Sequence, residues 1–205
     1  MKQRLIVGIT GATGIAYGVR LLQTLRDLDV ETHLVVSKAG ELTRAYETGY
    51  SAQELRGLAT HHYAPQDIAA PISSGSFRTL GMVIIPCSAR TLGEVATGVT
   101  TTLLTRAADV VLKERRRLVL VVRETPLSLI HLRNMVTVAE AGATVFPPVP
   151  AFYTMPTSLD DVIADTVARV LDQFGIEVPG MKRWGEPDEG ADDAETSSTD
   201  QAARD

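Results

Sequence analysis

Residues 82–98 read MVIIPCSARTLGEVATG, and this stretch decides the fold. Its first four residues are apolar without alternation, which is typical of a strand that is buried on both faces of a sheet. Ser88 follows at the position of a helix N-cap. The first backbone N–H groups of such a helix point outward and can bind an anion. The stretch therefore predicts a buried strand that ends at an anion-binding turn.

Further apolar segments along the chain alternate with helical spacing in the same way. This alternation indicates a parallel sheet that is covered by helices on both faces and wound by right-handed crossovers. We predict an α/β fold, a doubly wound Rossmann- or flavodoxin-like three-layer sandwich with a mainly parallel sheet. The expected strands are 5–10, 33–36, 82–85, 118–122 and 144–146, and the expected helices cover about 16–25, 38–47, a short piece from 51, 89–96, 103–114, 129–139 and 159–174.

Composition bounds the class of protein. The chain has 205 residues and 44% hydrophobic content, enough for one well-buried domain. It contains no apolar run of the roughly 20 residues that span a bilayer, and no apolar signal-peptide core follows Lys2 and Arg4, so we expect a cytoplasmic protein without a membrane partner. The single Cys87 excludes an internal disulfide, and four scattered histidines without ligand spacing predict no metal site.

The charge is distributed unevenly. The net charge is −5, yet residues 186–205 alone hold eight acidic side chains against one arginine, and no large apolar residue follows Trp184. A segment of this composition buries too little apolar surface to offset the entropy that ordering costs. We therefore expect a domain over 1–185 and an acidic disordered tail over 186–205. The remaining body is slightly basic but carries no concentrated basic stripe. Nucleic acid is therefore not expected as a partner, and a small anionic ligand is.

Polar residues stand at the ends of four of the five expected strands. They are Thr10 to Thr13, Ser37, Ser88 to Thr91, and the pair Arg123-Glu124. In parallel α/β sheets, ligands bind beyond the carboxyl ends of the strands, so these residues should form one site. The turn over 11–14 lacks the glycine spacing of a dinucleotide fingerprint, and a tight turn without any ligand remains an alternative.

Other candidates are less specific. Glu47 ends a helix, where a carboxylate is unfavourable to the helix dipole, so it is either functional or an ordinary surface residue. Lys113 belongs to a charged run that also reads as a solvated helix end. Residues 74–76, Ser-Gly-Ser, could clamp a ligand or merely connect. Tyr153 alone reads as a packing residue, and Arg169 alone is uninformative, although together they could bind a phosphate.

The sequence resembles the UbiX/Pad family of flavin prenyltransferases over about residues 3–185. The resemblance is carried by many short motifs in a fixed order. These are GATG at 11–14, SK at 37–38, ET at 47–48, SGS at 74–76, PCS at 86–88, RAAD at 106–109, LKER at 112–115, RETP at 123–126, IHL at 130–132, NM at 134–135, PAFY at 150–153 and RW at 183–184.

This resemblance implies a metal-independent transferase. Its substrates would be reduced FMN and dimethylallyl monophosphate, and its product would be prenylated FMN, joined at flavin N5 and C6 and delivered to a UbiD-type decarboxylase. The chain would form a homo-oligomer, with a dodecamer as one candidate. The implied FMN-binding residues are Gly11, Ala12, Thr13, Ser37, Ser88, Ala89, Arg90, Thr91 and Arg123.

The resemblance also implies roles in the transfer itself. Tyr153 and Arg169 would bind the donor phosphate, together with Lys113 and Glu124 and with Arg106 nearby. Departing phosphate needs positioned cations and hydroxyls, and Lys113, Tyr153 and Arg169 suit that need. Glu47 would move the proton that leaves when the second bond forms, with Thr13 beside flavin N5. Glu47, Thr13, Lys113 and Glu124 are thus the implied catalytic set.

Two departures and two rival functions accompany this reading. Thr13 stands where many members have serine, and Ile68 stands where some have a tryptophan, so rate or substrate choice should differ. A flavin-dependent cysteine decarboxylase of the same fold is one rival, although such proteins carry Pro-Ala-Ser-Ala-Asn-Thr where this chain has PCSART at 86–91. A passive FMN carrier is the other.

Overall fold

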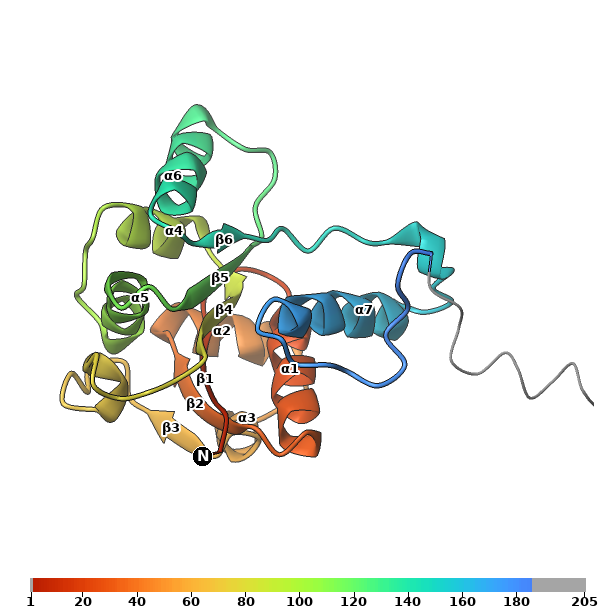
Figure 1. Cartoon of the computed structure of the whole chain (residues 1–205), viewed down its shortest axis with the longest axis horizontal. Coiled ribbons are helices and arrows are strands. Elements are labelled where there is room, and N and C mark those ends of the chain that lie inside the picture. Colours follow the sequence, from red (N-terminus) through yellow and green to blue (C-terminus); the bar gives the residue numbers. More distant parts are fainter. Residues whose placement is uncertain (1, 186–205) are drawn as a thin grey trace, which may run out of the picture.

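The computed structural model describes residues 2–185 and forms a single α/β unit (Figure 1). Its six strands are all parallel and lie in the order β3-β2-β1-β4-β5-β6. The predicted doubly wound fold is therefore confirmed. The acidic tail expected at 186–205 lies outside the described residues.

The described elements follow the predicted alternation of strand and helix. Among them, no helix combines the length and apolar character that a membrane crossing requires. The bounds are β1 Arg4–Ile9, α1 Ile15–Asp27, β2 Glu31–Val36, α2 Lys38–Glu47, α3 Ala52–Gly57, β3 His61–Tyr63, the 3-10 turn η1 Pro71–Ser73, β4 Gly81–Cys87, α4 Ala89–Ala96, α5 Leu103–Lys113, β5 Arg117–Val122, α6 Leu129–Glu140, β6 Thr144–Val145, the 3-10 turn η2 Phe152–Thr154, and α7 Leu159–Asp172.

Two apolar cores lie on opposite faces of the sheet. Successive residues of a strand point to opposite faces, so β4 sends Val83 into one core and Ile84 into the other. The first core is closed by α1 and α7, and the second by α4, α5 and α6. Figure 1 shows α1 and α7 on one side of the strands and α5 on the other. This arrangement explains why the strands are apolar without alternation.

The sequence predicts five strands, and the structure adds a sixth. β3 pairs in parallel with β2 at the edge of the sheet and has only three residues, His61–Tyr63. Its first two side chains are exposed. A short polar strand of this kind has no hydrophobic period, so the pattern that identifies the central strands cannot identify it.

The direction of winding reverses between β1 and β4, which are neighbours in the sheet although β2 and β3 separate them in sequence. Helix α1 crosses this point closely. A Cβ atom on Gly18 would lie 2.8 Å from the carbonyl oxygen of Ile85 and 2.9 Å from Cδ1 of Ile9. Glycine at position 18 therefore allows α1 to pack directly against the two central strands.

We predict that Gly18→Ala lowers the free energy of unfolding by about 1–3 kcal/mol, because the added methyl group overpacks this contact. Gly57→Ala is the matched control, since a Cβ atom there meets nothing within 4 Å. Urea unfolding followed by circular dichroism measures both. Equal stability of Gly18→Ala and the parent chain would contradict the close approach.

Candidate active site

One buried threonine joins the carboxyl ends of β1 and β4. Thr10 follows β1 directly and is 1% exposed. Its hydroxyl donates to the carbonyl oxygen of Pro86 at 2.8 Å and accepts from the backbone N–H of Ser88, also at 2.8 Å. The loops after β1 and β4 are thereby held side by side where the sheet reverses, which is the usual place for a ligand in such folds. The sequence places Thr10 among the polar strand ends but gives it no role.

Ser88 begins α4 at this same edge. Its hydroxyl oxygen accepts from the backbone N–H of Thr91 at 3.3 Å and donates to the Thr91 hydroxyl at 3.1 Å. The first backbone N–H groups of a helix have no acceptor within the helix, so those of Ala89 and Arg90 are the donors that this turn presents. The Arg90 side chain points elsewhere, because it pairs with Glu94 at 2.9 Å. The predicted anion-binding turn therefore has the geometry that it needs.

The loops after β1 and β2 also meet. Ser37 caps α2 by accepting from the backbone N–H of Gly40 at 3.0 Å, and its own N–H donates to the carbonyl oxygen of Ile9 at 2.9 Å. A Cβ atom on Gly11 would lie 2.4 Å from Cβ of Ala39. Glycine at position 11 is thus required for the close contact between these two loops.

Glu47 occupies the beginning of α1, although it belongs to the end of α2. Gly14 is the N-cap of α1, has φ 104°, and supplies no capping side chain. The Glu47 carboxylate replaces that cap, because its Oε2 accepts from the N–H of Gly14 at 2.8 Å and of Ile15 at 3.0 Å. From the sequence, Glu47 is expected at the C-terminal end of a helix, where the helix dipole disfavours a negative charge. The structure corrects this, because a negative charge is stabilised at the N-terminus of the helix that it caps.

The pKa of Glu47 is lowered from its ordinary value of 4.5. Partial burial by itself would raise this pKa, but hydrogen bonds from the Thr13 side chain and from the N–H groups of Ile15 and Gly14 outweigh it. The positive charge of Arg123 adds to the lowering. Glu47 is therefore ionised at neutral pH, and it lies within the electrostatic influence of Arg123 at the end of β5.

Arg123 reaches this edge because it follows β5 directly. Its N–H donates to the carbonyl oxygen of Cys87 at 3.1 Å, which continues the β4–β5 pairing by one more step. Glu124 comes next, and its Oε1 accepts from the N–H of Thr125 at 3.0 Å. Both side chains are exposed. The ends of β1, β2, β4 and β5 are thus gathered as predicted.

Two predicted donor-site residues lie elsewhere in the chain. Lys113 ends α5 just before β5 begins, so it lies at the amino edge of the sheet, about 20 Å from Arg123 if each residue of β5 advances 3.3 Å. Its Nζ is 2.5 Å from Oε1 of Glu114. Arg106, further back on α5, donates to the carbonyl oxygen of Ser73 at 3.3 Å and to Asp109 at 2.7 Å.

Tyr153 and Arg169 lie in a third place. Tyr153 belongs to η2, at the tip of an arm that projects away from the sheet (Figure 1). Its ring packs edge-on against Trp184, with 5.4 Å between centroids. Thr154 bonds to Asp165 of α7, and Arg169 lies one turn further along that helix, paired with Asp172 at 3.2 Å. Within one chain, this pair does not meet the strand ends.

A hollow of about 290 Å³ lies between η2 and α7. Its lining contains two acidic residues, Asp161 and Asp165, and one basic residue, Lys182. No residue expected to bind FMN belongs to its lining, which consists of Thr154, Met155, Pro156, Asp161, Ala164, Asp165, Gly180 and Lys182.

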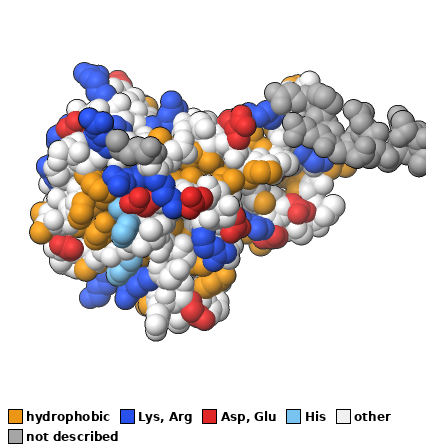
Figure 2. Space-filling view, turned by 60° about the horizontal axis from the view of Figure 1, so that its bottom comes forward, with side chains coloured by type: hydrophobic (Ala, Val, Ile, Leu, Met, Phe, Trp, Pro, Cys, Tyr) orange, Lys and Arg blue, Asp and Glu red, His pale blue; other side chains and the backbone are white. Residues whose placement is uncertain are grey.

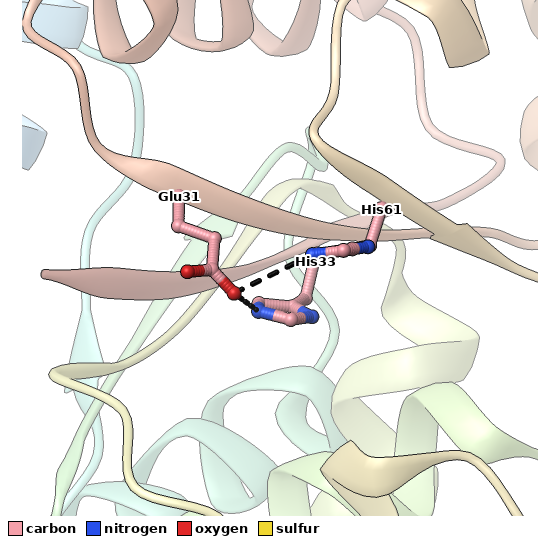
Figure 3. Close-up of side chains that lie close together, drawn as sticks. All are labelled: Glu31, His33 and His61. Atoms are coloured by element: carbon pink, nitrogen blue, oxygen red, sulfur yellow. Dashed lines mark hydrogen bonds and ion pairs between the residues drawn. The ribbon is translucent and has the colours of Figure 1, made fainter. Parts of the chain in front are cut away.

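The amino edge holds a polar cluster that the sequence does not predict. Glu31, His33 and His61 bring one ligand-type atom each within 4.8 Å of one another (Figure 3). The pKa of His33 is lowered, first by burial and then by the charge of His61, although Glu31 acts in the opposite direction. The signal in the sequence is the i, i+2 spacing of Glu31 and His33 on one face of a strand.

Comparison with known proteins agrees with this geometry. The Flavoprotein family model matches residues 1–171. The class of protein is therefore a flavoprotein, which agrees with the parallel sheet and the anion-binding turn at its carboxyl edge. Flavin prenyltransferase UbiX of Escherichia coli strain K12 is 63% identical over 185 residues, covering 89% of this chain and 98% of that protein. This chain belongs to the UbiX family of flavin prenyltransferases.

Solved structures show the same relationship. A crystal structure of AnUbiX (PadA1) in complex with FMN and dimethylallyl pyrophosphate has a TM-score of 0.89 and 51% identity, covering 91% of this chain and all of that one. A dodecameric FMN-dependent UbiX-like decarboxylase from Escherichia coli O157:H7 has a TM-score of 0.87 and 55% identity, covering 90% of this chain and all of that one.

We predict that Thr10→Val lowers the free energy of unfolding by about 1–3 kcal/mol, because it leaves the Ser88 N–H without its acceptor and removes one of the two hydrogen bonds to the Pro86 carbonyl, which keeps the bond from the backbone N–H of residue 10. Thr10→Ser keeps the hydroxyl and should remain close to the parent chain. Urea unfolding measures both variants. If valine and serine cost the same, the two hydrogen bonds do not join the strands as described.

We predict that Glu47→Gln destabilises the chain at neutral pH by about 0.5 kcal/mol, a small effect because the carboxylate is exposed and screened. Since the folded-state pKa lies below 4.5, the stabilisation is complete above that value and is lost as the pH falls through the folded pKa. Urea unfolding from pH 7 downward should show the two chains converging. Glu140→Gln, at the exposed end of α6, should show no such pH-dependent difference.

Proposed function

We propose that this chain transfers the dimethylallyl group of dimethylallyl monophosphate to N5 and C6 of reduced FMN. The product is prenylated FMN, the cofactor of UbiD-type decarboxylases. One observation carries the proposal: the ends of four strands place hydroxyls, helix N-terminal N–H groups and one arginine around a single ionised carboxylate, in a chain 63% identical to a flavin prenyltransferase. Localisation in the cytoplasm stays a prediction.

The residues at the carboxyl edge fit FMN by their chemistry. The donors are Thr13, Ser37, Ser88, the first N–H groups of α4, and Arg123, which together suit a phosphate and a polar ring edge. The Glu47 carboxylate among them is already stabilised by the N–H groups at the beginning of α1 and by the charge of Arg123. We assign FMN binding to Gly11, Ala12, Thr13, Ser37, Ser88, Ala89, Arg90, Thr91 and Arg123.

Glu47 and Thr13 form the proton path in this proposal. Bound reduced FMN would supply the nucleophile, and N5 would lose its proton and bond to the allylic carbon as phosphate departs. Closing the second bond, from C6 to the far carbon of the prenyl double bond, would add a proton to the middle carbon of the prenyl group and remove the proton of C6. The Thr13 hydroxyl is directed at Glu47, so its oxygen can accept a proton on its other side. Glu47 is ionised at neutral pH and is therefore an acceptor rather than a donor when the path is used. The lowered pKa favours rapid return of that proton to water.

The donor phosphate needs residues from more than one copy of the chain. Tyr153 lies on η2 at the tip of the arm, and Arg169 lies on α7. Lys113 and Arg106 lie on α5, whereas Glu124 lies at the carboxyl edge of the sheet. The arm exposes large apolar side chains, among them Phe152 at 77% and Met155 at 79%. Exposed apolar side chains grouped on a projecting segment mark an interaction surface. We therefore propose a homo-oligomer, dodecameric like the Escherichia coli O157:H7 protein, in which the arm of one copy completes the site of another.

The test of the reaction is anaerobic. The reaction mixture contains the purified chain, chemically reduced FMN and dimethylallyl monophosphate without air. The mass of the extracted flavin is then measured by mass spectrometry. We expect the flavin to gain one dimethylallyl group, and a parallel reaction with the diphosphate decides which donor the chain prefers. Glu47→Gln should bind FMN as the parent chain does but form product more slowly. An unchanged flavin mass with both donors, from folded protein that binds FMN, would refute the transferase and leave an FMN carrier.

The shared site has a separate test. Arg169→Ala should raise the KM for the donor about 10- to 100-fold, because a charge-assisted contact to phosphate is lost. When the Arg169→Ala and Glu47→Gln chains are co-expressed, the mixed oligomer should recover activity. If each site takes Glu47 from one chain and Arg169 from another, about a quarter of the sites contain both native residues. Arg26→Ala, at the exposed end of α1, is the control with parent activity. Two slow variants that stay slow after co-assembly would show that each site belongs to one chain.

A further inference from the structure

The cluster at the amino edge lies at the opposite end of the strands from the proposed flavin site. Glu31 begins β2, His33 follows two residues later on the same face, and His61 begins β3. His33 and His61 are direct register partners of the β2–β3 pair. Figure 2, turned so that this end comes forward, shows histidine side chains at the surface beside basic and acidic groups. The flavin site uses none of these residues.

The three side chains converge on one point. Oε1 of Glu31 lies 3.1 Å from Nε2 of His33 and 3.4 Å from Nε2 of His61. Figure 3 shows both rings directed at this oxygen, and the rings are stacked with 4.8 Å between centroids. Zinc bonds to nitrogen and oxygen are about 2.0–2.2 Å long, so ligand atoms around a tetrahedral zinc lie about 3.3 Å apart. These two separations match that spacing, and the two imidazole nitrogens, which lie within 4.8 Å of each other, reach it when the exposed His61 ring turns toward the ion.

The contacts around His33 fix its ring in the way that is usual for a metal-binding histidine. Its side chain is 2% exposed, and its second ring nitrogen, Nδ1, lies 2.9 Å from the Tyr63 hydroxyl. The Phe77 ring packs edge-on against it at 5.0 Å. A hydrogen bond on the other nitrogen is the usual device that fixes the ring and tautomer of a metal-binding histidine. His61 is 49% exposed, so an ion has a path from solvent.

We propose that Glu31, His33 and His61 bind one divalent transition-metal cation, with zinc as the expected occupant. Two imidazoles and a carboxylate favour zinc, copper, nickel or cobalt over magnesium or calcium, which prefer all-oxygen sites. The ion joins β2 to the three-residue edge strand β3, and water takes the remaining position. It stabilises the sheet edge and takes no part in prenyl transfer.

Arg4 sets a limit on the affinity of this site. Its Nε lies 3.1 Å from the same Oε1 of Glu31, and its guanidinium lies over the Phe77 ring at 5.0 Å. A cation at Oε1 displaces this contact, and Arg4 then keeps the other carboxylate oxygen. Because its positive charge remains close, removing it should strengthen binding of the metal. A histidine that binds metal by chance at the surface would not respond in this way.

The test uses the full chain without an affinity tag, stripped of metal and titrated with zinc chloride by calorimetry. We expect one zinc per chain, and a raised midpoint of thermal unfolding when zinc is present. His61→Ala should weaken binding more than about tenfold and abolish the thermal shift. His62→Ala is the matched control, because that neighbouring side chain faces Arg56 and Glu41 instead, and it should keep both.

Two further readouts decide the arrangement. Cobalt(II) in place of zinc should give the visible absorption of a tetrahedral site in the parent chain and in His62→Ala, but not in His61→Ala. Arg4→Met should tighten zinc binding by about tenfold. The proposal is overturned if His61→Ala and His62→Ala bind zinc alike, if the parent chain binds none, or if Arg4→Met leaves the affinity unchanged.

Discussion

The hydrogen bonds of the Thr10 hydroxyl hold together the two strands between which the sheet reverses. Parallel strands bring all their carboxyl ends to one edge, but a site forms there only if the loops leaving neighbouring strands are kept in contact. Thr10 supplies that contact by bonding to both Pro86 and Ser88 while it is almost fully buried. Helices α1 and α4 both begin next to it. The hydroxyl adds to the backbone pairing of β1 with β4, which the bond from the Thr10 N–H to the Pro86 carbonyl extends, and it fixes the N–H of Ser88 at the beginning of α4.

Glu47 shows how a tertiary contact reverses a local preference. At the end of its own helix, its charge opposes the dipole, but the same carboxylate caps α1 and accepts from Thr13. Stability and chemistry are therefore coupled at this residue, because the ionised form serves both. In the proposed reaction, an acceptor held in place by three hydrogen-bond donors needs no reorganisation when a proton arrives through Thr13. The arrangement also ties the end of α2 to the beginning of α1, so that both helices share one fixed point.

The single chain holds half of the proposed machinery in place and leaves the other half dispersed. The residues proposed to bind FMN gather at one edge, whereas the cations proposed for the donor phosphate lie on α5 and α7 and are paired with Asp109, Glu114 and Asp172. A departing phosphate can compete for those cations once a neighbouring copy brings them to the flavin. Assembly is then part of the catalytic mechanism, because it delivers positive charge to a site that otherwise contains little. The projecting apolar arm is the segment suited to that contact.

The amino-acid sequence by itself determined the fold class and predicted which residues lie at the carboxyl edge of the sheet, where the flavin site is proposed. Strands such as 82–85 and 118–122 are apolar on both faces, and that pattern is compatible with burial between two helical layers. Ser37, Ser88 and Arg123 each follow such a strand, so their gathering at one edge needed no further information. The polar strand β3 escaped detection because hydrophobic periodicity reports burial, and its first two residues are exposed. Only the tertiary structure showed that Glu47 caps α1, that Thr10 bridges β1 and β4, and that His61 meets His33 across a strand pair. These contacts depend on register and crossing geometry between distant segments, which local residue patterns do not encode.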